Sequence, residues 1–317
     1  RNFLMKGISK NAQNTNPIIC LGMPVYNGED FLKQRLESII NQSYSNFILI
    51  ISDNASTDNS QKICEEISKK DKRITYFRQE ENKGGYWNFN FVLKKAKTKY
   101  FVWVPPDDIW SQNFLEKNID VLEKNENIVG SIGELSLYNQ IKDPLTHKIR
   151  IKVLKNTKKF QYVHPAYGVI EEKIKFYLNY SMGAMIFGVY RTDKLQKAAP
   201  HFEHIKNGSM WMGDLAYILN IIKEGDFEVV NDAFMYKHVR ERSTSVIEYM
   251  KKENFNLKII VFIHFPFTFW CLRNLGLKIF LKNFGYFIKL NIKGEYSIMA
   301  ESVRMCKRVL CGQSKYW

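Results

Sequence analysis

An acidic residue, Asp53, stands where an apolar run gives way to a polar segment that leads into a helical pattern. At such a strand end a carboxylate projects into the crevice of a parallel sheet, where it can accept a hydrogen bond from an N–H group of a nucleotide base. Asp53 and Asp58 are also residue types that suit turns and helix caps. Taken alone, the segment favours that structural interpretation.

Two adjacent carboxylates, Asp107 and Asp108, follow a second apolar run at Tyr100 to Val104. Neighbouring carboxylates at a strand end can supply the hard oxygen ligands that Mg²⁺ and Mn²⁺ prefer. The alternative is a polar turn in which Asp108 caps the helix that contains Phe114. We expect Asp108 to be this cap, which leaves Asp107 as the stronger metal ligand.

A third polar cluster follows a short aromatic segment at Phe234 to Lys237. Its members are hydrogen-bond donors, and they are His238, Arg240, Arg242, Ser243 and Ser245. Such a set can bind the oxygens of a diphosphate and close over it once substrate has entered. The alternative interpretation is a solvated basic turn.

Strand and helix patterns alternate along the first part of the chain. The run from Ile18 to Met23 is almost wholly apolar, which is typical of a parallel strand covered on both faces. Further elements follow in order: a helix that contains Phe31 to Ile40, a strand at Phe47 to Ile51, a helix near Asp58 to Lys69, a strand near Ile74 to Phe77, a helix near Trp87 to Lys97 and a strand at Tyr100 to Val104. Short connections favour parallel strands with right-handed crossovers, so a nucleotide should lie at their C-terminal ends.

The pattern is less regular beyond residue 134. From Glu134 to Tyr180 no clear period appears, and we predict loops with short elements, as in an acceptor-side insertion. The pattern then predicts a strand at Met182 to Tyr190, a helix at Leu215 to Ile222, and short strands at Phe227 to Val230 and Phe234 to Lys237. The α/β architecture is expected to end near Ser245.

Four short segments resemble, in order and spacing, those of glycosyltransferase family 2. They are Pro24-Val25-Tyr26-Asn27, Ser52-Asp53-Asn54-Ala55-Ser56-Thr57-Asp58, Asn82-Lys83-Gly84 and Pro106-Asp107-Asp108. The resemblance covers about Ile18 to Ser245. It implies a GT-A fold, a Rossmann-like mixed and mainly parallel sheet flanked by helices. It also implies that a metal-bound nucleoside diphosphate sugar lies in the sheet's crevice and that the sugar is transferred with inversion.

The resemblance also implies roles for single residues. Pro24, Tyr26 and Glu29 would border the nucleotide, Asp53 would bind the base, and Lys83 and Gly84 would approach base and ribose. Asp107 resembles the end of the family's D-x-D signature and would contact the metal and the diphosphate. The usual first acidic position is Pro105 here, so contacts normally made from that position must come from elsewhere or be absent.

A carboxylate just before an apolar helix is where the family often has its general base. Asp214, preceded by Gly213, has that position and is our candidate base for deprotonating the acceptor hydroxyl. The alternative role for Asp214 is an ordinary helix N-cap. His238 with Arg240 and Arg242 looks like the family's flexible C-terminal loop, in which His238 would be a metal ligand and the arginines would bind diphosphate.

The C-terminal region is basic and rich in aromatic residues. We divide the chain into an extension at 1–16, the GT-A domain at 17–245, and a basic amphipathic helical region at 246–317. With a net charge of +15, the chain is expected to meet an anionic membrane surface through this last region. The alternative is a helical subdomain packed on the core or on another subunit, so a homo-oligomer stays open. The scattered cysteines indicate neither a disulfide framework nor a zinc site.

Together these features predict a glycosyltransferase that moves a single sugar from a nucleoside diphosphate donor, with UDP favoured, to a hydroxyl acceptor. The acceptor is expected to be a lipid-linked or cell-envelope glycan, the cofactor Mn²⁺ or Mg²⁺, and the location cytoplasmic, peripheral on the inner face of the cell membrane. The alternatives are a nucleotidyltransferase of similar fold and a basic nucleic-acid-binding protein. Pro24 to Glu29 lacks the basic glycine-rich signature of the first, and no groove-reading module supports the second, so no nucleic-acid partner is expected.

Overall fold

The computed structural model describes residues 16–105, 108–142, 149–153, 163–180, 183–199, 213–238 and 265–292. The strands are β1 (Ile19–Val25), β2 (Phe47–Asp53), β3 (Ile74–Arg78), β4 (Tyr100–Trp103), β5 (Ile109–Trp110), β6 (Ile128–Lys142), β7 (Ile149–Val153), β8 (Val189–Arg191) and β9 (Asp226–His238). The helices are α1 (Glu29–Ile40), α2 (Ser60–Lys70), α3 (Gly85–Lys95), α4 (Phe114–Lys124), α5 (Ile170–Tyr180), α6 (Thr192–Ala198), α7 (Gly213–Glu224), α9 (Phe265–Leu275), α10 (Leu277–Lys282) and the 3-10 helix η1 (Gly183–Phe187).

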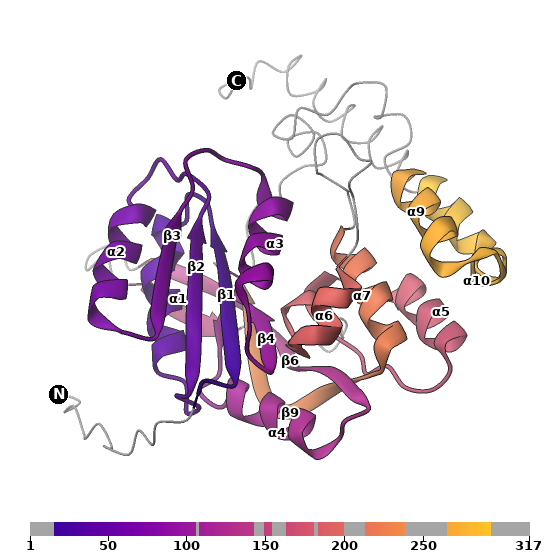
Figure 1. Cartoon of the computed structure of the whole chain (residues 1–317), viewed down its shortest axis with the longest axis horizontal. Coiled ribbons are helices and arrows are strands. Elements are labelled where there is room, and N and C mark those ends of the chain that lie inside the picture. The colour runs from indigo at the N-terminus through magenta and orange to yellow at the C-terminus, as the bar shows by residue number, and fades with distance from the viewer. Residues whose placement is uncertain are drawn as a thin grey trace, which may run out of the picture.

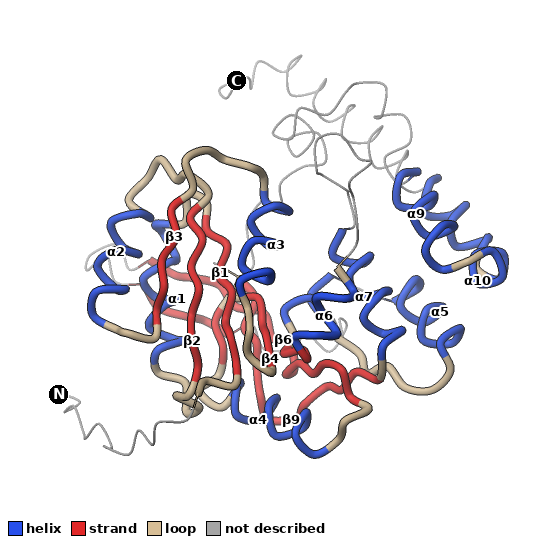
Figure 2. The backbone as a smooth tube through the Cα atoms, in the orientation of Figure 1, coloured by secondary structure: helices blue, strands red, loops and turns tan. Residues whose placement is uncertain are grey.

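The strands form one mixed sheet in the order β3-β2-β1-β4-β8-β6-β9-β5, with β7 paired to β6. The pairings among β3, β2, β1 and β4 are parallel, as is that of β6 with β9. Strand β8 is antiparallel to both of its neighbours, and β5 is antiparallel to β9. The predicted mixed α/β fold is confirmed, and Figure 2 shows its strands between layers of helices.

The order of the first four strands determines which face each helix covers. Right-handed crossovers from β1 to β2 and from β2 to β3 run in one direction, whereas the crossover from β3 to β4 runs back. Helices α1 and α2 therefore cover one face and α3 the other, where it packs on β1 and β2 (Figure 1). Every residue of β1 is buried, which explains why its sequence is continuously apolar rather than alternating.

The second half of the chain differs from its predicted elements. The strand predicted from Met182 to Tyr190 is wrong, because residues 183–187 form η1 and only Val189–Arg191 pair as β8. A short apolar run does not distinguish a buried strand from a buried helical turn. The loops predicted at Glu134 to Tyr180 are also partly wrong, since β6 continues to Lys142 and α5 occupies Ile170–Tyr180.

A long irregular strand replaces the two short strands predicted between residues 227 and 237. In β9, Val230 pairs with Gly133 of β6, but the next β6 residue, Glu134, pairs with Phe234. The excess residues 231–233 form a bulge in which Asp232 has a φ of 61°. Gly133 lies directly against the Ala233 carbonyl, where a Cβ would overlap it. The bulge therefore requires glycine on the facing strand.

The described C-terminal residues form a helical unit beside α5 and α7, shown in yellow tones in Figure 1. It contains α9, α10 and a further helical stretch at 284–292. None of the described helices is both long enough and apolar enough to cross a membrane. The predicted domain limit near residue 245 lies outside the described residues, as do 246–264 and 293–317.

Candidate active site

The loop after β1 is bonded to the loop after β2 at the carboxyl edge of the sheet. Asn27 donates its N–H to Ser56 Oγ at 3.0 Å, and Asn27 Oδ1 accepts the N–H of Thr57 at 2.8 Å. Pro24 lies buried within β1, whereas the neighbouring Tyr26 side chain is 50% exposed. Tyr26 is therefore exposed at this edge, on a turn that lies between buried β1 and the hydrogen bonds of Asn27 to the loop after β2.

The N-termini of α1 and α2 are joined by reciprocal hydrogen bonds. Glu29 Oε2 accepts the N–H of Asn59 at 3.0 Å and its side-chain Nδ2 at 2.7 Å. Asp58 Oδ2 accepts the N–H of Glu29 at 3.0 Å, and Oδ1 accepts the N–H of Ser60 at 2.9 Å. Asp58 is thus a turn residue, as one of the two interpretations held. Glu29, a predicted nucleotide neighbour, holds α2 in place.

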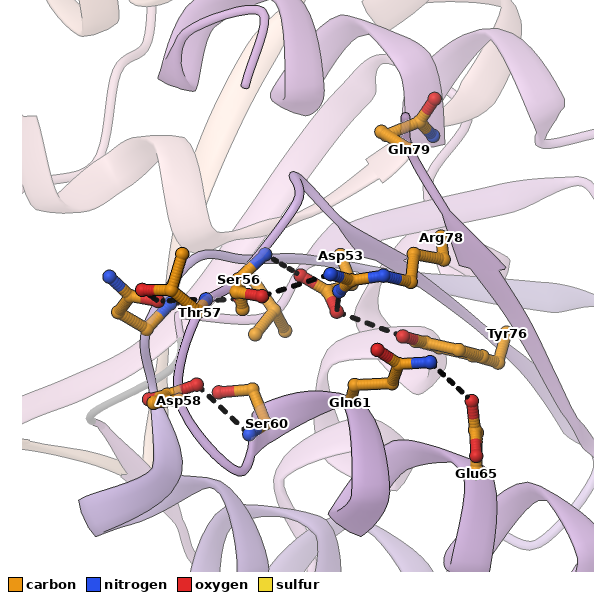
Figure 3. Close-up of polar contacts among 12 residues, drawn as sticks. Asp53, Ser56, Thr57, Asp58, Ser60, Gln61, Glu65, Tyr76, Arg78 and Gln79 are labelled. Carbon is orange, nitrogen blue, oxygen red and sulfur yellow. Dashed lines mark hydrogen bonds and ion pairs between the residues drawn. The ribbon is translucent and has the colours of Figure 1, made fainter. Parts of the chain in front are cut away.

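Asp53 is fully buried at the end of β2, and its carboxylate is bonded within the protein (Figure 3). Oδ2 accepts hydrogen bonds from Tyr76 Oη at 2.8 Å and from Arg78 Nη1 at 2.6 Å. Oδ1 accepts the N–H of Ser56 at 2.8 Å. A buried carboxylate requires such partners, because an unpaired charge in the interior is costly. Arg78 stands opposite Asp53 in the parallel register of β2 and β3.

The pairing changes what this edge offers to a ligand. Asp53 lies at the strand end, as the sequence predicts, but its side chain has no exposed surface. The Arg78 side chain is 34% exposed and also donates from Nη2 to the carbonyl of Ser56 at 3.0 Å. The member of the pair that meets solvent is therefore the Arg78 guanidinium.

Asn54 connects the end of β2 to the loop before α3. Its Nδ2 donates to Asn82 Oδ1 at 2.6 Å and to the carbonyl of Gly84 at 3.2 Å, while its Oδ1 accepts the N–H of Lys83 at 3.0 Å. The Lys83 ammonium lies 4.9 Å from the ring centroid of Trp87. Lys83 and Gly84 are therefore held beside the edge that carries Asp53, and their contact with base and ribose stays a prediction.

Asp108 is buried between the end of β4 and β5, with Lys237 of β9 nearby. Lys237 Nζ is 3.6 Å from Asp108 Oδ2 and lies over the Phe187 ring at 5.7 Å. The predicted helix cap at Asp108 is wrong, because β5 intervenes and Asn113 holds the N-cap position of α4. Asp108 instead pairs with a cation from a distant strand.

Asp214 opens α7, and its side chain is exposed to solvent. Its Oδ1 accepts the N–H of Leu215 at 2.8 Å. Desolvation by the surrounding protein raises the pKa of the Asp214 carboxyl, against the lowering effects of that N–H and of the Lys237 charge. Solvent contact together with net desolvation is expected of a carboxylate that is open on one side and surrounded by protein on the others.

Gly183 and α7 position this carboxylate. A Cβ at residue 183 would overlap Asp214 Oδ2, so only glycine leaves the carboxylate its place. The Tyr217 ring of α7 packs on Trp103 at the end of β4, with ring centroids 5.2 Å apart, and its hydroxyl donates to Asn90 Oδ1. The start of α7 is thereby held near the end of β4.

The acidic candidates share one edge of the sheet. Asp53 ends β2 and Asp108 follows β4, and these strands flank β1 on either side. The axes of β2 and β4 are therefore about 10 Å apart, and Asp108 lies five residues beyond the end of β4, directly before β5. Asp214 and Asp108 are both linked electrostatically to Lys237. Asp107, Arg240 and Arg242 lie outside the described residues, and of His238 only the backbone is described.

The described residues do not make up a metal centre. Across the ranges given above, no three His, Cys, Asp or Glu side chains gather closely enough to hold an ion. Asp108 has Lys237 as its cation rather than an open coordination position.

Three residues of this edge are absent from the sequence-based candidates. Arg78 directly follows the strand predicted at Ile74 to Phe77, and that position is the signal that could have identified it. The sequence predicts Lys237 only as part of a strand, because its pairing with Asp108 depends on the fold of β9. Gly183 has no sequence signal beyond being a glycine before an apolar run.

A family model and the curated proteins similar to this chain all point to glycosyltransferases. The family model described as glycosyl transferase family 2 matches residues 20–180. An uncharacterized glycosyltransferase of Haemophilus influenzae is 38% identical over 135 residues, covering 42% of this chain and 54% of that protein. The Bacillus subtilis teichuronic acid biosynthesis glycosyltransferase TuaG is 31% identical over 109 residues, 34% of this chain and 43% of that protein. The chain thus spans about half or less of the length of these curated relatives.

Solved structures show a similar fold. The mannosyltransferase PcManGT of Pyrobaculum calidifontis, in complex with GDP-Man and Mn²⁺, gives a TM-score of 0.54 at 12% identity over 90% of this chain and 74% of that one. Residues 1–349 of S. aureus TarS, in complex with UDP-GlcNAc, give a TM-score of 0.51 at 18% identity over 80% of this chain and 66% of that one. At these identities the likeness concerns the fold, and it agrees with the predicted GT-A architecture.

Proposed function

Because this chain belongs to glycosyltransferase family 2, we propose that it transfers one sugar, with inversion, from a nucleoside diphosphate sugar to an acceptor hydroxyl. The observation that carries the proposal is Asp214, an exposed carboxylate with a raised pKa beside the edge where parallel strands end. That edge is where open α/β sheets bind nucleotides. The acceptor proposed is a lipid-linked or cell-envelope glycan, which agrees with the name of TuaG.

The proposed chemistry is a single displacement. The acceptor oxygen forms a bond to the anomeric carbon while the bond from that carbon to the diphosphate oxygen breaks, and the electron pair leaves with the diphosphate. The hydroxyl proton passes to an Asp214 carboxylate oxygen. A carboxylate whose pKa is raised is a stronger base, so its desolvation favours this proton transfer. Lys237 adds a positive charge at the same edge.

The donor nucleotide is proposed to be UDP. The resemblance favours it, and S. aureus TarS binds UDP-GlcNAc, although PcManGT binds GDP-Man on a similar fold. Tyr26, Lys83 and Gly84 stand around the ends of β1 and β2, where a base and a ribose would lie. Because Arg78 covers Asp53, a base approaching Asp53 would meet the Arg78 guanidinium first.

Metal dependence is part of the proposal through Asp107 and His238. When bound, Mn²⁺ or Mg²⁺ would offset the charge of the diphosphate. The test is turnover with and without added Mn²⁺, using UDP-, GDP- and dTDP-sugars and extracted lipid acceptors. Full turnover after exhaustive chelation would remove the metal from the proposal and leave the base in place.

Replacing the proposed base tests the transfer itself. Asp214→Asn keeps the size of the side chain and its acceptor for Leu215, but cannot take the proton. We expect kcat to fall by about 10²–10⁴-fold, the usual contribution of a general base, with donor affinity little changed. Asp107→Asn, which removes a charge of the proposed metal ligand, is expected to abolish turnover.

The matched control is Asp120→Asn, which changes an exposed carboxylate on α4 and should leave the rate unchanged. Near-normal turnover by Asp214→Asn would reject its role as the base. Release of pyrophosphate from a nucleoside triphosphate would instead indicate a nucleotidyltransferase. Filter binding of nucleic acid with a steep salt dependence would indicate the other alternative.

A further inference from the structure

An exposed apolar stripe runs along α10 and the helical stretch at 284–292. It consists of Leu277, Leu281, Phe284, Ile288 and Ile292, whose exposed fractions are 63%, 58%, 49%, 45% and 64%. Phe265 and Phe269 of α9 are also more than half exposed. Among the described residues, most of the exposed large hydrophobic side chains therefore lie in this one unit.

The stripe is not an unfinished core of the helical unit. Leu277 and Leu281 are four residues apart on α10, and Phe284, Ile288 and Ile292 are four residues apart on the stretch at 284–292, so each of the two helices has an apolar face toward solvent. The inward side chains between them, Phe280, Asn283 and Phe287, are already buried. Phe280 and Phe287 stack with ring centroids 4.7 Å apart. The unit thus has both a packed inner face and a second apolar face toward solvent.

The charged residues of the helical unit itself all have one sign. Residues 265–292 contain Arg273, Lys278, Lys282 and Lys289 and no aspartate or glutamate. The three lysines each follow a member of the stripe by one position, so their ammonium groups lie along its border. Lys278 Nζ is 3.3 Å from Glu171 Oε1 of α5 but stays 77% exposed. Long lysine side chains beside an apolar face can reach headgroups while that face enters the lipid.

Charge distinguishes a lipid surface from a second copy of the chain. In a two-fold dimer the same patch meets itself, so the stripe would bring two sets of cations together. Like charges at close range oppose such a contact, whereas an anionic bilayer attracts every one of them. A bilayer also accepts the apolar side chains without a shaped groove.

We propose that the apolar stripe and its flanking lysines form a peripheral binding surface for anionic lipid, with the helices lying in the plane of the membrane interface. The surface is joined to the catalytic domain through α7. Lys223 Nζ, near the end of α7, donates to the carbonyl of Asn274 in α9 at 3.2 Å. The helix that begins with Asp214 therefore also supports the lipid-binding unit.

The test is co-sedimentation of the full chain with vesicles, which requires no sugar transfer and so can succeed or fail independently of the proposed function. Wild-type protein should bind vesicles of phosphatidylcholine with phosphatidylglycerol far better than vesicles of phosphatidylcholine alone, and added salt should weaken binding. Lys282→Glu with Lys289→Glu should weaken binding by at least about thirtyfold, since loss of each lysine charge costs about a factor of five and the new glutamates add repulsion. Leu281→Ser with Phe284→Ser should weaken it at least about tenfold.

The control is Lys69→Glu with Lys70→Glu, which reverses two exposed lysines on α2 and should leave binding nearly unchanged. All the changed side chains are exposed, and circular dichroism checks that each variant stays folded. Equal binding by the stripe variants and wild type would overturn the proposal. So would a wild-type dimer that the serine variants convert to monomer, because the stripe would then be covered by a second copy.

Discussion

Asp214 combines two properties that seldom occur together in a surface carboxylate. It meets solvent, yet desolvation raises its pKa from the ordinary value of 3.8. Ionisation is therefore harder in the folded protein than in the unfolded chain. The fold loses some stability by keeping this group charged near neutrality, which is common where a side chain is positioned for chemistry rather than for stability.

The raised pKa predicts how rate and stability depend on pH. The base acts when ionised, so kcat/KM should rise with pH through an apparent pKa above 3.8, measured as a pH–rate profile of the wild type. The folded state binds this proton more tightly, so its contribution to stability falls as pH rises from the ordinary pKa to the raised one. Urea unfolding near neutrality should therefore show Asp214→Asn to be no less stable than wild type. A clear loss of stability would contradict the raised pKa.

Gly183 provides a second test at the scale of one residue. In Gly183→Ala the new methyl group would displace the Asp214 carboxylate. A misplacement of about 1 Å can cost about 10²-fold in rate, and we expect a fall in kcat of that order with donor affinity retained. Gly285→Ala is the matched control, since a Cβ there meets nothing within 4 Å. Unchanged turnover in Gly183→Ala would show that Asp214 tolerates displacement.

At the scale of elements, the pairing of β3 with β2 fixes the Asp53 carboxylate. The register that sets Arg78 opposite Asp53 also brings Tyr76 to the same oxygen. The buried charge is thus satisfied by one neighbouring strand and by the turn at Ser56. Any nucleotide contact at this edge acts on a network that already holds β3 to β2.

Removing Arg78 should therefore weaken the fold. Arg78→Ala leaves a fully buried carboxylate without its cation, and we expect the free energy of unfolding to fall by about 1–3 kcal/mol in urea titrations. Lys99→Ala breaks an exposed pair with Glu123, whose side chains are 51% and 43% exposed, and should cost less than about 1 kcal/mol. Equal losses would show that Asp53 keeps its charge satisfied through Tyr76 and Ser56 alone.

The elements that the sequence predicts well are those buried on both faces. β1, β2 and β4 are short apolar runs between polar turns, and their limits agree with the structure to within a residue or two. η1 has the same apolar character without being a strand. β6 and β9 extend well beyond their apolar runs, because pairing with neighbouring strands rather than a local pattern sustains them.

At the scale of the molecule, the candidate site was predictable in position but not in its contacts. Because parallel strands end together, the motifs predict that Asp53 and the acidic pair lie at one edge, and of these Asp53 and Asp108 are among the described residues. The partners of these acids come from other strands: Arg78 through the register of β3, and Lys237 from more than one hundred residues beyond Asp108. No local pattern reports such pairings.

The lipid-binding proposal and the transfer proposal meet in α7. One end of this helix carries Asp214, and the other end is bonded to α9. A helix of twelve residues is about 18 Å long. Under both proposals, an acceptor anchored in the membrane beside α9 would need to extend its hydroxyl along the length of α7 to reach Asp214.

The bulge in β9 sets the register of the residues that follow it, and this register decides from which face of the sheet Lys237 extends. Residues 231–233 are an odd excess over β6, so side chains beyond them emerge on the face opposite to that of an uninterrupted ladder. In a relative shortened here by one residue, the lysine would keep its face if the bulge absorbed the loss, and it would turn away from Asp108 if the pairing beyond the bulge moved by one residue. A change of register at this point would therefore remove the lysine charge from beside Asp108, even where every amino acid of the site is retained.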